Sequence, residues 1–163
     1  MTCICILFLL ISISLGHIGL VASAIDVVLS TARTRVHRSA RAITVGAYDA
    51  RQNTLAAFSG RGFTWNNQFI KPDLLAPGVD IISCAPGGGY TTKSGTSMAT
   101  PFVTGAASLL LQWGIIEGND PFLYGEKMRA FLIRGTRPLP GFQEYPSPEI
   151  GWGTLCALNS IFS

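Results

Sequence analysis

The stretch from about residue 97 to residue 113 (SMATPFVTGAASLLLQW) constrains the fold most strongly. It is long enough for one helix, and its small residues, Ala99, Gly105, Ala106 and Ala107, allow close packing on several sides. A helix of this kind is buried rather than amphipathic. The chain must therefore place other layers of structure around this helix.

Two short runs before the helix have the character of β-strands. Residues 42–47 (AITVGA) are apolar and partly β-branched, and residues 79–84 (VDIISC) follow the turn residues of APG. Such runs, bounded by turn residues, predict strands, and the first is expected to be buried. Residues 86–89 (PGGG) then break the chain. Strands followed by a buried helix predict a compact α/β domain.

A second helix is expected before Gly135, which marks its end. Asn119 or Asp120 is suited to cap its start, and Pro121 fits the first helical position. One face is expected to carry four apolar residues: Tyr124, Met128, Phe131 and Leu132.

Composition excludes several classes of protein. Charged residues make up 13% of the 163 residues and hydrophobic residues 48%, which excludes general disorder. The net charge of +3 is too small to predict a nucleic-acid partner, and residues 26–40 are expected to be a basic, solvated connecting stretch. The four cysteines form neither a C-x-x-C pair nor a zinc-type cluster, so we predict free, buried thiols and no metal or cofactor.

Residues 1–25 form a hydrophobic segment without Asp, Glu, Lys or Arg. An apolar middle followed by the small residues 22–24 (ASA) is typical of a signal peptide, and the length also suits a membrane anchor. Together these interpretations predict an extracellular or membrane-associated protein, and an anchor would contact the membrane through residues 1–25. The alternative is that residues 10–16 (LISISLG) form a buried strand of a chain whose true beginning has been lost.

The residues suited to chemistry lie at positions 93–101 (KSGTSMATP), where a glycine-containing loop leads into the long helix. This position exposes the Ser97 hydroxyl, leaves backbone N–H groups unpaired and directs the positive end of the helix dipole at the same place. An oxyanion formed there would be stabilised. Pro101 is expected to cost little, because the first-turn N–H groups lack partners in any case. On these grounds alone, Ser97 is either a nucleophile or a helix cap.

Residues 95–101 (GTSMATP), with Val103 and Gly105 after them, resemble the nucleophile motif of the subtilisin-like serine peptidases, the subtilases. Four other segments resemble parts of that family in the same order: ITVGA at 43–47, FS at 58–59, KPDLLAPG at 71–78 and GWG at 151–153. The resemblance covers about residues 41–160. It implies that residues 41–163 are the C-terminal part of a peptidase domain.

The implied fold is α/β, a partial subtilisin-like doubly wound, mostly parallel sheet flanked by helices, with the first half of the domain missing. The resemblance further implies that Ser97 is the nucleophile, which attacks a peptide carbonyl and forms an acyl-enzyme. Protein or peptide substrates are implied with it. An incomplete sheet would also leave a strand edge uncovered, which predicts poor solubility or dependence on a partner.

The Asp and His that this family places before its serine are not found. The sequence has two histidines, His17 and His37; the first Asp, Asp26, follows His17, and His37 lies among arginines without a motif. No Asn precedes Asn53, so the family's side-chain oxyanion donor is not found either.

A serine without a base keeps its proton, and we therefore expect the chain alone to have no useful peptidase activity. A complementing chain that supplies Asp and His would restore it. The alternative function is a non-catalytic secreted or membrane-associated scaffold derived from a subtilase.

Overall fold

The structure is a computed structural model, and it describes residues 42–63 and 69–162. The hydrophobic segment 1–25 and the basic stretch 26–40 lie outside the described residues, as do His17 and His37 within them. The predictions of a signal peptide, anchor or strand at residues 1–25 and of a solvated stretch at residues 26–40 therefore remain predictions.

The central strand of the sheet is β1 (Val45–Asp49). It pairs in parallel with β5 (Leu74–Pro77) and, at its carboxyl end, antiparallel with the two-residue β2 (Thr54–Leu55). The apolar residues of β1 and β5 face packed layers on both sides of the sheet, which explains their nearly continuous apolar sequences. The buried strand predicted at residues 42–47 is confirmed, with its regular pairing beginning at Val45.

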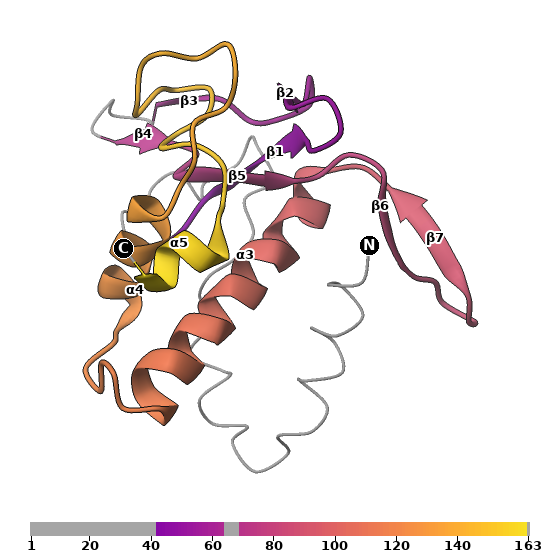
Figure 1. The fold of residues 1–163 in the computed structure, drawn as a ribbon. Coiled ribbons are helices and arrows are strands. Elements are labelled where there is room, and N and C mark those ends of the chain that lie inside the picture. The colour runs from indigo at the N-terminus through magenta and orange to yellow at the C-terminus, as the bar shows by residue number, and fades with distance from the viewer. Residues whose placement is uncertain (1–41, 64–68, 163) are drawn as a thin grey trace.

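The strand predicted at residues 79–84 forms, but not inside the main sheet. Its regular part is β6 (Ile81–Cys84), which pairs antiparallel with β7 (Tyr90–Lys93) in a hairpin that projects from the domain (Figure 1). The glycines at 87–89 have φ values of 85°, 102° and 78°, so PGGG turns this hairpin rather than ending the structure. Strand β5 is the second buried strand instead.

A segment close to the C-terminus extends the sheet beyond β5. The N–H of Leu75 donates to the carbonyl of Gly153, and the N–H of Leu155 donates to the carbonyl of Leu75, both at 2.8 Å. Gly151 has a φ of 60°, and a Cβ there would lie 2.2 Å from the carbonyl oxygen of Pro72. The GWG sequence therefore serves the close approach of two backbones, which explains the need for glycine.

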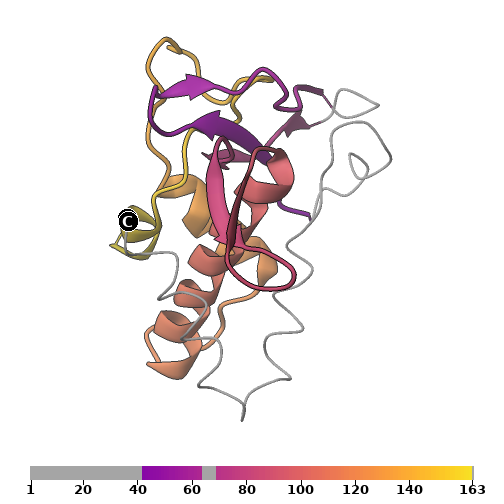
Figure 2. The same cartoon turned by 90° about the vertical axis from the view of Figure 1, so that its right-hand side faces the viewer.

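The long helix α3 (Thr96–Leu111) lies across β1 and β5 and continues as a π-helical turn, η2 (Gln112–Ile116) (Figures 1 and 2). This confirms the predicted helix and its burial: its buried residues are Ala99, Val103, Gly105, Ala106, Ala107 and Leu110. The combined helix Thr96–Ile116 has 21 residues and a mean hydropathy of 1.3, enough by length and composition to cross a membrane. Its packing against the sheet accounts for that apolar character.

The second predicted helix is shorter than expected. Helix α4 (Gly125–Arg134) ends at Gly135 as predicted, but its N-cap is Tyr124 rather than Asn119 or Asp120. The N–H of Asp120 donates to the carbonyl of Gly114 and that of Leu123 to Asp120, so this stretch is held in a turn against η2. The predicted apolar face consequently fails at Tyr124, which is 61% exposed.

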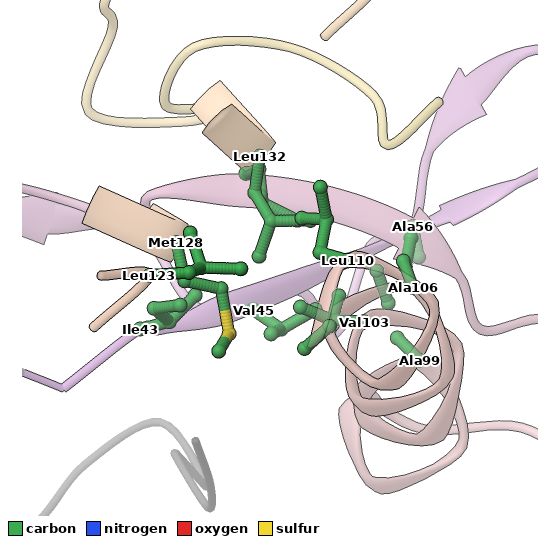
Figure 3. Packing of buried hydrophobic residues seen from close by; sticks show 14 residues of the cluster. Ile43, Val45, Ala56, Ala99, Val103, Ala106, Leu110, Leu123, Met128 and Leu132 are labelled. Atoms are coloured by element: carbon green, nitrogen blue, oxygen red, sulfur yellow. The ribbon is translucent and has the colours of Figure 1, made fainter. Parts of the chain in front are cut away.

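The rest of that face is confirmed. Met128 and Leu132 of α4 are buried and join a core with β1 and α3, where Val45, Val103 and Leu110 meet them (Figure 3). Helix α5 (Ala157–Phe162) packs beside α4. All three α-helices of the described residues lie on one side of the sheet, and the loop at 139–150 packs on the other.

A buried charged cluster joins the starts of β1 and β5 to α4. Oδ2 of Asp73 accepts hydrogen bonds from the Thr44 N–H (2.7 Å), the Thr44 hydroxyl (2.9 Å) and Lys71 Nζ (2.7 Å), while Oδ1 accepts from Arg129 Nε at 3.0 Å. Lys71, 1% exposed, also donates to the carbonyl of Ala42. Burial lowers the pKa of Lys71, and the carboxylate of Asp73 opposes this.

The two cysteines in the described residues are free, as predicted, but they are not both buried. Cys156 is half-buried, whereas Cys84 is exposed. The prediction is wrong for Cys84 because its strand, β6, belongs to the projecting hairpin and not to the sheet.

Candidate active site

Ser97 is the second residue of α3, and its side chain is exposed. The helix begins after Gly95, whose φ of 158° and ψ of 161° lie in a region of the backbone map that is essentially reserved for glycine. Gly95 has no side chain to offer a cap, so the start of the helix stays open around Ser97. The cap interpretation of Ser97 receives no support, since no hydrogen bond of its hydroxyl occurs within the described residues.

Hydrogen bonds fix this turn above the carboxyl ends of the parallel strands. The N–H of Gly78, just after β5, donates to the carbonyl of Tyr48 in β1 at 3.0 Å, and the N–H of Gly95 donates to the carbonyl of Gly78 at 2.8 Å. The three residues form a ladder from the sheet to the helix start. In open α/β sheets, this end of the strands is where ligand sites are built.

Gly78 is a residue whose part in the site the sequence did not reveal. A Cβ on Gly78 would lie 2.6 Å from the Cβ of Ala47 and 2.9 Å from the carbonyl oxygen of Gly95. These contacts are too short for any side chain, so only glycine lets the turn before Ser97 pack directly on the sheet. The available signal is the APG at the end of KPDLLAPG (71–78), which carries the family resemblance but does not by itself show that Gly78 contacts Gly95.

The backbone at the helix start offers hydrogen-bond donors. The N–H of Met98 donates to the carbonyl of Gly95 at 3.0 Å, while those of Thr96 and Ser97 have no acceptor among residues 42–63 and 69–162. Together with the positive end of the helix dipole, these free N–H groups are suited to stabilise negative charge on an oxygen near Ser97 Oγ. The start of α3 therefore offers unpaired N–H donors beside Ser97.

The expectation for Pro101 is wrong. Because α3 begins at Thr96, Pro101 lies in its second turn and not among the first-turn residues that lack partners in any case. It supplies no N–H for the carbonyl of Ser97, which leaves that carbonyl outside the regular helical hydrogen-bond pattern.

The described part of the chain contains no histidine and no group of three metal-binding side chains. Asp80, two residues after Gly78, makes structural contacts. Its N–H donates to Ser94 Oγ at 2.9 Å, and its carboxylate pairs with Arg51 at 3.5 Å. The described residues thus bring together an exposed serine, Ser97, and unpaired backbone donors, and they contain no histidine.

Comparison with known proteins places this geometry in a family. The Subtilase family model matches residues 13–153, and the chain belongs to that family of serine peptidases. The match begins within the hydrophobic segment 1–25 and includes the basic stretch 26–40. The likeness therefore extends further toward the N-terminus than the motifs, which begin near residue 41, indicated.

Relatives with sequence similarity are named as serine proteases. The chain is 39% identical over 143 residues to the serine protease AprX of Bacillus subtilis, a match that covers 76% of this chain and 30% of AprX. The minor extracellular protease Vpr of the same species is 44% identical over 115 residues (66% of this chain, 14% of Vpr). An intracellular serine protease of Paenibacillus polymyxa is 39% identical over 85 residues (50% of this chain, 26% of that protein).

Solved structures agree with the sequence comparisons. The chain resembles the CspB protease of Clostridium perfringens with a TM-score of 0.73 and 45% identity, covering 78% of this chain and 27% of CspB. The subtilisin-like α/β fold expected from the motifs is thereby confirmed. The chain spans less than a third of the length of AprX and of CspB.

Proposed function

We propose that Ser97 is the nucleophile of a subtilisin-type endopeptidase site. The observation that carries this proposal is the exposed hydroxyl of Ser97 at the start of α3, beside unpaired N–H groups and anchored through Gly78 to the ends of β1 and β5. Membership of a family of serine peptidases supports protein or peptide substrates.

The reaction assigned to this site proceeds in two halves. Ser97 Oγ bonds to the carbonyl carbon of a peptide while a base takes the hydroxyl proton, and the carbonyl oxygen becomes an oxyanion that accepts a hydrogen bond from the Ser97 N–H. The C–N bond then breaks, the proton passes to the leaving amine, and an ester remains on Ser97. Water attacks that ester by the same route and releases the acid.

The base has to come from outside the described residues. His17 and His37 are the only histidines of the sequence, and neither carries the surroundings that the family gives its catalytic histidine. Loss of the histidine alone lowers the turnover of subtilisin by roughly six orders of magnitude, so we propose that the 163-residue chain does not hydrolyse peptides by itself. A complementing chain that supplies Asp and His belongs to this proposal.

Our proposal also concerns the compartment in which the protein acts, extracellular or membrane-associated. Relatives named as extracellular and as intracellular both match, so family membership leaves the compartment open. Residues 1–25 support export or membrane association by their composition, whereas the family match from residue 13 supports residues 10–16 as a strand of the domain.

Labelling with a fluorophosphonate, which reacts with activated serines, tests the proposal. We expect no labelling of the purified chain, and labelling at Ser97 once the missing part of the site is supplied by a subtilase fragment that carries Asp and His. Ser97→Ala should abolish that labelling, while the matched control Ser94→Ala, three residues away, should retain it.

Two results would contradict the proposal. Labelling of the chain alone at Ser97, abolished by His37→Ala, would show that the chain holds its own base and is an enzyme by itself. Labelling that never occurs under complementation, in a complex shown to form, would leave the non-catalytic scaffold as the function.

A further inference from the structure

A lysine without a counter-charge lies close to Ser97 in the chain. Lys93 is the last residue of β7, the strand that leads directly into the turn before α3 (Figure 1). Its side chain is exposed, and it takes part in none of the ion pairs formed within residues 42–63 and 69–162. The described part of the chain thus carries an unpaired positive charge four positions before the proposed nucleophile.

The face of the hairpin on which Lys93 lies offers no acid. Cross-strand partners and alternate residues of an antiparallel pair share one face. The register pairs Lys93 with Ile81 and, two residues further along the hairpin, Thr91 with Ser83, so its neighbours on that face are uncharged. Asp80, at the start of the hairpin, already pairs with an arginine of the turn between β1 and β2. The ammonium group is therefore available to a ligand from outside the hairpin.

Hydrogen bonds hold the two residues that follow Lys93. The N–H of Asp80 donates to Ser94 Oγ at 2.9 Å, and the N–H of Gly95 donates to the carbonyl of Gly78 at 2.8 Å. Both bonds attach the segment to the connection between β5 and β6. The end of β7 and the start of α3 are consequently fixed relative to each other, and the four residues from one to the other span at most about 14 Å.

We propose that Lys93 is a specificity-determining residue that binds an acidic side chain of the substrate, so that the site prefers peptides with Asp or Glu near the scissile bond. This inference rests on the proposed function, in which Ser97 Oγ attacks the peptide. An extended peptide rises about 3.3 Å per residue, so a carboxylate within about four residues of the scissile bond comes within reach of Lys93. The ammonium group has three N–H donors for that carboxylate.

The expected preference is modest and depends on salt. An ion pair between exposed groups contributes little free energy, equivalent to a factor of about two to five in affinity. Salt screens such a pair, so the preference should shrink as the ionic strength rises.

Peptide hydrolysis by the complemented chain tests the preference. Two peptides differ only in Glu or Gln at one position, and this position is moved through the four residues on either side of the scissile bond. We expect kcat/KM to be about two to five times higher for the Glu peptide at one or more of these positions. Lys93→Gln should abolish the preference and Lys93→Glu should turn it into a preference for Gln. The matched control Arg134→Gln, at an exposed cation in the last turn of α4, should retain it.

Binding to a complemented chain that carries Ser97→Ala separates this inference from the proposed function. Fluorescence anisotropy of the same peptides gives their affinity without hydrolysis. Tighter binding of the Glu peptide, lost when Lys93→Gln is added, would support the inference even if the unaltered complex hydrolysed no peptide. Hydrolysis with equal kcat/KM at every position would overturn the inference and leave Ser97 as the nucleophile. A preference for Glu that survives Lys93→Gln, or binding of neither peptide, would overturn it as well.

Discussion

Replacement of Asp73 by Asn should be among the most damaging conservative changes in this chain. The carboxylate accepts hydrogen bonds from Thr44, Lys71 and Arg129, and the Lys71 side chain is 1% exposed. Asn keeps the size of Asp but removes the charge and directs an N–H₂ group at a set of donors. Lys71 is then left as a buried cation without its counter-charge.

Breaking a buried ion pair from one side costs about 3–5 kcal/mol of unfolding free energy. Domains of this kind have about 5–15 kcal/mol in total, so the variant should be marginal. Because burial already lowers the pKa of Lys71 from 10.5, loss of Asp73 should lower it further. Between the lowered pKa of folded Lys71 and its ordinary value of about 10.5, the unfolded state binds more protons than the folded state, and this pH interval is wider in the variant. The free energy of unfolding should therefore rise more with pH, up to about 10.5, in the variant than in the parent.

Urea unfolding followed by tryptophan fluorescence measures these effects. The control Asp80→Asn changes an exposed ion pair with Arg51 at 3.5 Å and should alter stability by at most about 0.5 kcal/mol. Adding Lys71→Met to Asp73→Asn should recover part of the loss, because the unpaired cation is removed. A loss below about 1 kcal/mol for Asp73→Asn, or no recovery in the double variant, would refute the account of the cluster.

Three further changes test the packing and the ionisation of the domain. Gly78→Ala should cost about 1–3 kcal/mol and weaken labelling of the complemented site, whereas Gly125→Ala, where a Cβ meets nothing within 4 Å, should be neutral or slightly stabilising in the same unfolding assay. Leu132→Ala in the core should cost about 2–5 kcal/mol, and the same change at the exposed Leu158 close to none. Burial raises the pKa of Tyr48 above 10.0, so its phenol stabilises the fold below that pH and this contribution is lost as the pH rises through the raised pKa. Tyr48→Phe should remove the corresponding late component from an absorbance titration, and an unchanged titration would contradict that assignment.

The turn at Ser97 was predictable from sequence because its requirements are local. A small-residue loop, a serine and an apolar helix adjoin one another in residues 95–111, and the structure places Ser97 at the helix start as expected. The buried strand near residues 42–47 and the helix end at Gly135 follow from equally local signals.

Predictions failed where a contact with another element competed with a local signal. Asp120 and Pro121 are good residues for a helix start, yet the hydrogen bond from Asp120 to Gly114 holds them in a turn against η2. The run at 79–84 has strand character, but Leu75 is already paired on both of its sides, by β1 and by the segment at Thr154, so no place beside β5 remains for it. The exposure of Cys84 follows from the same cause.

By itself, the sequence determined the α/β class, the helix that begins beside Ser97 and the family resemblance of the motifs, since each depends on residues adjacent in the chain. Only the tertiary structure decided why KPD, APG and GWG are needed. Asp73 is partnered by Arg129 from 56 residues away, Gly78 supports Gly95, and Gly151 lies against Pro72. Such pairings join segments far apart in the chain, and their geometry exists only once the strands and helices have packed together.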